Sequence, residues 1–525
     1  MRKRFCIQRK GFGIFRLVAV LSAIALYFAG PASAIDTELW GKPLSLTGIV
    51  KQGVSYGIAG DQYDTKKGVQ SLLTQVILEA KYEPNPDVSC FLTGKYNADQ
   101  AYPVLSDNHE WRNKQFNKSR TQRYLLDDWQ DILGEAHITV KKGDFYLRVG
   151  KQVVAWGETD GFRLMDQINP LDQRRGITDV EFENSIIPVW LIRAEYRPPT
   201  RPEWMQDLNY QFIFNPNPQF RGNQNILPGN DTAGIWAPRS DIPLGGPYPF
   251  DYAHLGSLAG TIEQPDNFSP EGFTYAGRIT ANIWDSRISL NGYYGRSLDF
   301  VYRNTPLGPI FATSPLDGRT ILSPVVEGYY PYFKYVGATF SRDISFLKAS
   351  ALGGVSPVLR VETLYAFNST FVDNVNNQFV KHDEFRGAVG MDWKIKVPLL
   401  NPKAYFSISP QIANQRIMNY PGSSIGPIVG SSLSEGYMTG LYENNWTSTL
   451  MISTSYMHTK LQPSFFWLRD WTNHSEFFRY QLIWEHSSVW KYTLGALVVR
   501  YSKDGVGLQP LMDKDHIYFN VACRF

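Results

Sequence analysis

Charged side chains of both signs are concentrated in one 35-residue segment, residues 154–188. Its acids and bases are Glu158, Asp160, Arg163, Asp166, Asp172, Arg174, Arg175, Asp179, Glu181 and Glu183. Charges of both signs in a lumen can set up a fixed field that filters solutes by charge and dipole. The segment also carries apolar residues, among them Trp156 and Ile168, that could fix it against a wall. Long connections of this kind are usually functional.

Hydrolytic chemistry would need a serine or aspartate beside a histidine. Eight histidines are present, and no Gly-x-Ser-x-Gly motif accompanies them. His109, His254 and His382 fall in predicted connections, whereas His137 and His516 fall on predicted strands. We therefore assign no catalytic residue and expect no enzyme.

The segments that flank these charged residues have the pattern of β-strands, and the last strand of the chain shows it most clearly. In the last ten residues, 516–525, every odd position is apolar, and the even positions include Asn520 and Arg524. A period of two indicates a strand with one apolar and one polar face. We expect Phe519, Val521 and Phe525 to face lipid and Asn520 and Arg524 to face inward. A terminal aromatic residue is typical of outer-membrane barrels, although a soluble sandwich could also close on such a strand.

Connection lengths separate these two folds. Candidate strands lie near residues 44–54, 70–83, 87–98, 132–142, 144–153, 189–197, 208–215, 272–283, 287–296, 331–342, 357–369, 384–396, 402–413, 445–458, 460–469, 474–485, 489–501 and 514–525. Long connections (99–131, 154–188, 216–271, 297–330 and 414–444) alternate with mostly tight turns such as 84–86, 141–144, 284–287 and 397–401. A sandwich has no reason to alternate in this way. The pattern predicts an all-β protein: a single closed antiparallel transmembrane β-barrel of about 16–18 strands, with short periplasmic turns and long extracellular loops. The last strand should close the ring on residues 44–54.

The N-terminus predicts export. Residues 1–34 contain six basic residues, an apolar stretch and an Ala-Ser-Ala cleavage site, as in a secretory signal peptide. Residues 35–525 then form the barrel, which we expect in the outer membrane of a Gram-negative bacterium, in contact with its lipid. That part has 46 basic and 49 acidic residues, which argues against a nucleic-acid partner. Aromatic residues, 14% of the chain, suit interfacial girdles.

Cysteines are few. Cys90 and Cys523 are predicted on lipid-facing positions three strands apart, beyond the reach of a disulfide. Without a Cys-x-x-Cys-His motif there is no c-type haem site, and we expect neither a metal nor another cofactor.

The wall of a barrel this wide encloses an aqueous lumen. Strand alternation places on its inner side Glu135, His137, Arg148, Arg193, Glu195, Arg278, Arg360, Glu362, Arg386 and Arg479. These charges either form a filter or simply pair with one another and hydrate the interior. The predicted constriction comprises Arg148, Glu158, Asp160, Arg163, Asp172, Arg193 and Glu195. In it, loop carboxylates would pair with Arg148 and Arg193. The alternative is an ordinary extracellular loop.

Two motifs in this segment carry a family resemblance. Lys-Gln-Val-Val-Ala-Trp-Gly-Glu at 151–158, followed by Ile-Asn-Pro-Leu-Asp at 168–172, resembles a large proteobacterial outer-membrane, porin-like family of unknown function. Members are often encoded near resistance-nodulation-division transporters and implicated in handling hydrophobic compounds. The resemblance thus implies a periplasmic transporter component as a partner. It supplies no catalytic residues.

The sequence therefore predicts an outer-membrane channel or conduit for small solutes or hydrophobic compounds, narrowed by residues 154–188. Two alternatives stay open: a barrel sleeve for a periplasmic efflux or electron-transfer complex, and an outer-membrane hydrolase. A sleeve would need an unobstructed bore, whereas a filter would need a constricting loop.

Overall fold

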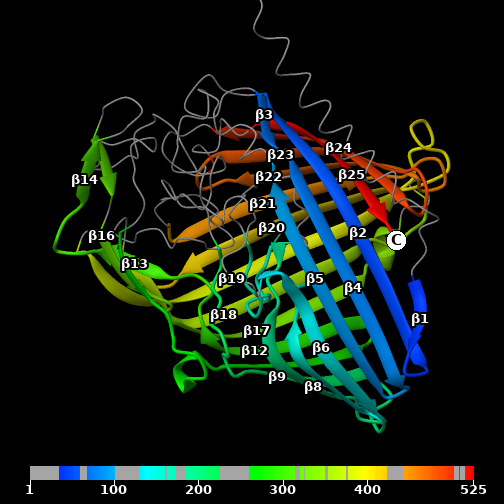
Figure 1. Cartoon of the computed structure of the whole chain (residues 1–525), viewed down its shortest axis with the longest axis horizontal. Coiled ribbons are helices and arrows are strands. Elements are labelled where there is room, and N and C mark those ends of the chain that lie inside the picture. The colour runs from blue at the N-terminus through cyan, green and yellow to red at the C-terminus, as the bar shows by residue number, and fades with distance from the viewer. Residues whose placement is uncertain are drawn as a thin grey trace, which may run out of the picture.

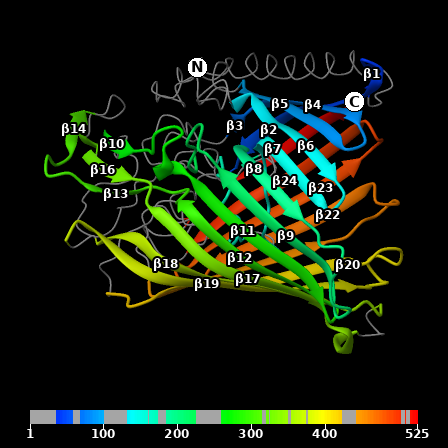
Figure 2. The same ribbon diagram turned by 90° about the horizontal axis from the view of Figure 1, so that it is seen from below.

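Within the described residues, eighteen antiparallel strands form one closed ring in the computed structural model (Figures 1 and 2). The structure describes residues 35–58, 68–100, 131–159, 162–172, 185–224, 259–313, 320–323, 325–348, 353–373, 376–421, 442–501, 508 and 515–525. The predicted signal peptide lies outside these ranges. The ring strands, in order, are β2 (Lys42–Gly57), β4 (Leu73–Asn85), β5 (Val88–Asp99), β6 (Leu133–Lys142), β7 (Phe145–Gln152), β8 (Val189–Tyr196), β9 (Met205–Asn215), β11 (Thr274–Ile283), β12 (Ser286–Arg296), β17 (Tyr332–Asp343), β18 (Val358–Asp373), β19 (Gln378–Ile395), β20 (Phe406–Ile417), β21 (Asn444–Ser453), β22 (Leu461–Asp470), β23 (Ser475–Glu485), β24 (Trp490–Tyr501) and β25 (His516–Arg524).

The ring closes between β25 and β2, with Asn520 opposite Gly53. This confirms the predicted pairing of the last strand with residues 44–54. Closure matters because an open edge would expose unpaired backbone groups to hydrocarbon.

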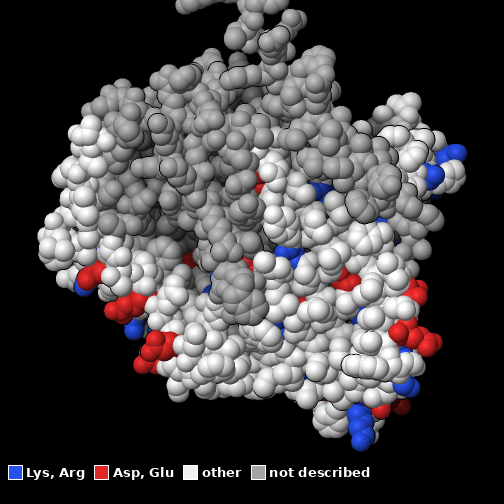
Figure 3. Space-filling model, viewed as in Figure 1, with Lys and Arg blue, Asp and Glu red and all other residues white. Residues whose placement is uncertain are grey.

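The outer surface of the ring is apolar. Exposed side chains on it include Leu78, Leu92, Ile138, Leu147, Val149, Phe212, Ile279, Leu290, Val336, Val389, Ile412, Leu482, Leu494, Ile517 and Phe519. In Figure 3 the visible described wall is mostly uncharged, and Lys, Arg, Asp and Glu are concentrated toward its margins. A closed barrel with such a surface spans a membrane, and bacterial barrels of this kind lie in the outer membrane.

The side chains of the last strand, β25, are oriented as predicted. Phe519 is 42% exposed on the lipid side, whereas Asn520 is 4% exposed. Phe525 lies over Gly48, where a Cβ would come within 2.4 Å of its ring. The guanidinium of Arg524 lies 3.6 Å from the Glu485 carboxylate on the inner side. Cys523 lies on the same face of β25 as Phe519, where neighbouring side chains bury it, and Cys90 and Cys523 are both free.

Smaller elements lie in the connections between ring strands. β1 (Ile35–Leu39) extends the edge of β2, and β3 (Gly68–Ser71) precedes β4. Two connections that we predicted to be without strands contain two small sheets: β10 (Ala259–Glu263), β13 (Val301–Asn304) and β16 (Val325–Tyr329) form one, and β14 (Ile310–Thr313) and β15 (Thr320–Ser323) form the other. The described 3₁₀ helices are η6 (Pro270–Gly272) and η7 (Ser345–Leu347). No helix in the described ranges is long and apolar enough to cross a membrane.

Candidate functional site: a loop folded into the lumen

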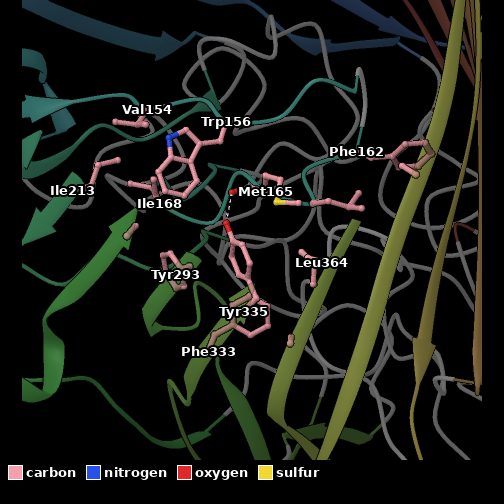
Figure 4. Packing of buried hydrophobic residues seen from close by; sticks show 14 of the residues in the cluster. Val154, Trp156, Phe162, Met165, Ile168, Ile213, Tyr293, Phe333, Tyr335 and Leu364 are labelled. Carbon is pink, nitrogen blue, oxygen red and sulfur yellow. Dashed lines mark hydrogen bonds between the residues drawn. The ribbon is translucent and has the colours of Figure 1, made fainter. Parts of the chain in front are cut away.

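The segment between β7 and β8 packs against the inner wall of the barrel. Its side chains Val154, Trp156, Phe162, Leu164, Met165 and Ile168 form one buried cluster with wall residues Val189, Leu191, Ile213, Ala276, Tyr293, Phe333, Tyr335, Leu364, Ala366, Ala388 and Ala413 (Figure 4). These wall residues come from eight strands, β8 to β20. Successive residues of a strand point to opposite faces. Because Phe212 and Tyr275 are exposed outside, their neighbours Ile213 and Ala276 face the lumen, and so does the loop.

Trp156 and Glu158 anchor the loop to the wall. The Trp156 indole N–H donates to Gln211 on β9 at 2.5 Å. The Glu158 carboxylate lies 3.3 Å from the Arg278 guanidinium on β11, and its backbone carbonyl accepts from Arg360 on β18. One stretch of three residues thereby reaches three wall strands.

Glu362 on β18 is the principal acceptor for this stretch. Its buried carboxylate accepts from the Glu158 N–H, from the Thr159 N–H at 2.5 Å and from the Thr159 hydroxyl at 2.9 Å. Two backbone N–H groups aimed at one carboxylate are strong, charge-assisted bonds. They fix both the height and the orientation of the loop on the wall.

Two glycines allow the loop to approach so closely. A Cβ on Gly157 would come within 2.9 Å of Asp166 and 3.5 Å of Glu362. A Cβ on wall residue Gly337 would come within 2.5 Å of the Met165 methyl group. Beside that contact the Tyr335 hydroxyl donates to the Met165 carbonyl at 2.9 Å (Figure 4). A side chain at Gly337 would push the loop away from the wall, whereas a side chain at Gly157 would clash with Asp166 inside the loop.

Asn169 closes the base of the loop. Its amide NH₂ donates to the carbonyls of Gln152 and Ile187, both at 3.0 Å, and its oxygen accepts from the Val154 N–H at 2.8 Å. The side chain is fully buried. It therefore joins the outgoing chain, the returning chain and the middle of the loop.

We expect Asn169→Ala to free the loop from its base. The change leaves a buried N–H and two carbonyls without partners, at about 1–3 kcal/mol each. Limited proteolysis of the folded barrel should cut the loop faster, whereas Asn282→Ala, which removes a bond to Asp207 near the periplasmic end of β11, should have no such effect. Equal cutting of both variants would contradict the role assigned to Asn169.

The predicted constriction residues are only partly brought together. Arg148 donates to Thr139 at 3.0 Å and stacks on Tyr146, and Arg193 pairs with Glu195. Glu158 pairs with Arg278 and not with either of these arginines, whereas their predicted pairing with the other loop carboxylates stays a prediction. The physical reason is the path of the loop: it brings Glu158 to β11 and β18 and not to β7 and β8, the strands that flank the loop.

The other predicted residues have different roles. Arg163 donates to the Asn169 carbonyl at 2.8 Å, inside the loop itself. Asp172 donates its N–H to the Ser185 carbonyl at 2.7 Å and forms a β-bridge with Gln224, at the loop base. Asp160 lies outside the described residues.

Sequence reasoning missed several partners of the loop. Arg278, Arg360 and Glu362 were predicted to line the wall, but not to hold the loop. Gln211 and Tyr335 were not singled out at all. Their inward position on alternating strands was the one signal that could have identified them. In the described part of the chain no group of three or more His, Cys, Asp or Glu residues is arranged to hold a metal ion.

The profile of the family described as "Protein of unknown function (DUF1302)" matches residues 16–525. The chain belongs to this family. That result agrees with the resemblance of residues 151–158 and 168–172 to an outer-membrane family of unknown function. A comparison with curated proteins finds no match.

Solved structures of outer-membrane proteins are similar to the chain. They include Pseudomonas aeruginosa OpdK with vanillate (8% identity, TM-score 0.43, covering 92% of this chain and 98% of that chain). Acinetobacter baumannii OccAB3 has 8% identity and a TM-score of 0.43, covering 93% of this chain and 100% of that one. Salmonella typhi OmpF in complex with daunomycin has 9% identity and a TM-score of 0.37, covering 94% and 100%.

Proposed function

We propose that the protein is an outer-membrane channel for small polar solutes, with residues 154–188 narrowing its lumen. One observation carries the proposal: Trp156, Glu158 and Met165 are bonded to the inner faces of four wall strands, β9, β11, β17 and β18. A loop held in this way inside a closed ring reduces the cross-section open to solutes.

The charges at the loop support selection by charge. Glu158 faces the Arg278 guanidinium at 3.3 Å, and Arg360 also binds Asp392 at 2.8 Å. Fixed charged groups in a lumen can select solutes by charge and dipole. Arg148 on β7 and Arg193 and Glu195 on β8 add further charged groups to the inner wall.

Polar solutes fit the site better than hydrophobic compounds do. The apolar wall residues of the cluster are already covered by the loop's own side chains, since Trp156, Leu164 and Met165 are at most 1% exposed. The same packing disfavours a sleeve, because a sleeve needs an open bore. No observation in the described residues favours a hydrolase.

Reconstitution tests the proposal. Purified, refolded protein added to a planar bilayer should give discrete current steps, and reversal potentials in a salt gradient should report the sign of selectivity. Heat-modifiable migration in detergent gels checks folding independently. A folded barrel that gives no steps would overturn the channel.

A periplasmic transporter component as partner, implied by the family resemblance, stays a prediction. Cross-linking in whole cells, followed by identification of captured envelope proteins, tests it. A channel that works alone in bilayers does not need that partner for passive flow.

A further inference from the structure

A group of basic side chains, the basic cluster, lies on the inner face of the neighbouring strands β6, β7 and β8 (Figure 2). Its members Lys141, Arg148 and Arg193 lie around the ring of Tyr146. The Lys141 Nζ atom is 5.9 Å from the ring centroid, and the guanidinium carbons of Arg148 and Arg193 are 5.5 and 5.4 Å from it. Leu147 is exposed on the lipid side, so its neighbours Tyr146 and Arg148 face the lumen.

The strand register holds these like charges side by side. Arg148 on β7 and Arg193 on β8 are direct cross-strand partners. Lys141 on β6 is opposite Tyr146, the next inward residue of β7. Like charges in directly opposite positions destabilise a sheet. An anion bound between the side chains removes this repulsion.

The carboxylate nearest to the arginines is fully engaged. Glu195, which is 5% exposed, accepts from the Arg193 Nε atom at 2.7 Å and from the Gln211 amide at 2.9 Å. The guanidinium of Arg197 lies 3.7 Å from its second oxygen. Gln211 in turn accepts from Trp156 of the loop, so Glu195 lies directly beside the point where the loop is anchored. Glu195 therefore offsets the charge of Arg193 and Arg197 only in part, and it has no oxygen left for the rest of the cluster.

Arg148 and Lys141 have weaker partners. Arg148 carries five N–H donors and makes one described hydrogen bond, from Nε to the Thr139 hydroxyl at 3.0 Å. Glu135, also on the inner face of β6, accepts from the Val153 N–H at 3.0 Å instead. Among the residues that the structure describes, no carboxylate forms an ion pair with Arg148 or Lys141.

Solvent reaches the basic cluster from the periplasmic end of the lumen. Lys141 lies one residue before the end of β6, and Arg197 directly follows the last residue of β8. Lys141 is exposed, and the side chains of Arg197 and Arg193 are 72% and 23% exposed. Because Arg193 faces the lumen, its exposed surface is open to a solute on the periplasmic side of the loop.

We propose that the basic cluster binds small oxyanions with two negative charges, the chemistry that dicarboxylates and hydrogen phosphate share. Arg148 holds one oxyanion group through two parallel N–H donors, and Lys141 supplies the second positive charge. A dianion offsets both cations that lack a described carboxylate partner, whereas a monoanion offsets one of them and a cationic solute is repelled.

The proposal rests on the channel function and names its substrate class. Three probes test it at mildly alkaline pH, where inorganic phosphate is mostly a dianion: succinate, inorganic phosphate and butyrate, a monoanion as long as succinate. Succinate or phosphate should interrupt the current at about one tenth of the concentration that butyrate needs, which equals about 1.4 kcal/mol. The stronger blocker of the two shows whether dicarboxylates or phosphate are the ligand.

Variants assign the contacts. Arg148→Gln should remove the advantage of the dianion over butyrate and shift the reversal potential toward cation preference. Arg148→Lys keeps the charge without the paired donors and should be intermediate. Arg342→Gln is the matched control and should behave as wild type, because Arg342 is an exposed arginine at the periplasmic end of β17 on the same outward face as Val336. Equal block by all three anions, or block by the dianion that is unchanged in Arg148→Gln, would overturn the site.

The two proposals fail differently. Current steps without block by succinate or phosphate would refute the anion site and leave the channel intact. Where no steps occur, titration calorimetry of both dianions into the detergent-solubilised barrel, with Arg148→Gln beside it, still decides. Heat of binding that is lost in the variant supports the site, and no heat in wild type rejects it.

Discussion

Removing residues 153–188 is expected to raise the single-channel conductance several-fold. Gln152 and Val189 are register partners at the outer ends of β7 and β8, so a short Gly-Ser turn can rejoin the hairpin without disturbing the ladder. The excision takes away every loop contact with β9, β11, β17 and β18. Conductance rises with the open cross-section, and ion selectivity should flatten because Glu158 leaves with the loop.

The control for this excision is a connection at the periplasmic end. Residues 344–357 join β17 to β18, and Asp343 and Val358 are register partners there, so the same kind of turn can replace them. This second variant should conduct as wild type. If the 153–188 excision folds and conducts like its control, the loop does not restrict flow and the constriction is refuted.

Most of the barrel could be predicted from residue alternation. A wall between lipid and water imposes a period of two on every strand, which is why Phe519 and Asn520 face as expected. The predicted positions of the strand ends were less accurate. The strand predicted at 402–413 begins only at Phe406, because Asn401 accepts from the N–H groups of Lys403 and Ala404 and holds them in a turn. Such local capping is not visible in a hydrophobic pattern.

The partners of the loop could not be predicted, for a geometric reason. Glu158 and Glu362 are 204 positions apart in the chain, and β18 is six places around the ring from β7, the strand that Glu158 follows. Alternation tells which residues face the lumen, but not how far a loop reaches across it. The inward-facing arginines of the two flanking strands, Arg148 on β7 and Arg193 on β8, were therefore chosen, although Arg193 is already paired with Glu195. Long-range pairing depends on curvature and loop path, which no short motif encodes.

The small sheet of β10, β13 and β16 was missed for a related reason. Its strands are four or five residues long, and β10 pairs in parallel with β16, more than sixty residues later. Short strands give too few alternating positions to stand out from a loop. Their pairing is fixed by the ring strands that bring the two connections together.

Glu362→Ala is expected to detach the loop from β18 while the barrel stays folded. The change removes the acceptor of three hydrogen bonds and leaves two loop N–H groups and the Thr159 hydroxyl without it, at about 1–3 kcal/mol for each group that stays buried. The free energy lost with these three bonds exceeds that of any one remaining contact between the loop and the wall. The loop should therefore leave the wall for part of the time. Recordings should show added flicker and a higher mean conductance.

Glu362→Gln tests whether Glu362 holds the loop through its hydrogen-bond acceptor or through its negative charge. The amide keeps one oxygen at the same reach, so the N–H groups retain a neutral acceptor and the effect should be intermediate. Glu476→Ala on β23, which removes a carboxylate paired with Arg469 away from the loop, is the matched control for side-chain loss. Gel migration after heating should be the same for all three variants, since the backbone ladder of β18 with β17 and β19 is unchanged. Wild-type currents in Glu362→Ala would mean that Trp156 and Arg278 hold the loop without help from β18, and the anchoring assigned to Glu362 would be wrong.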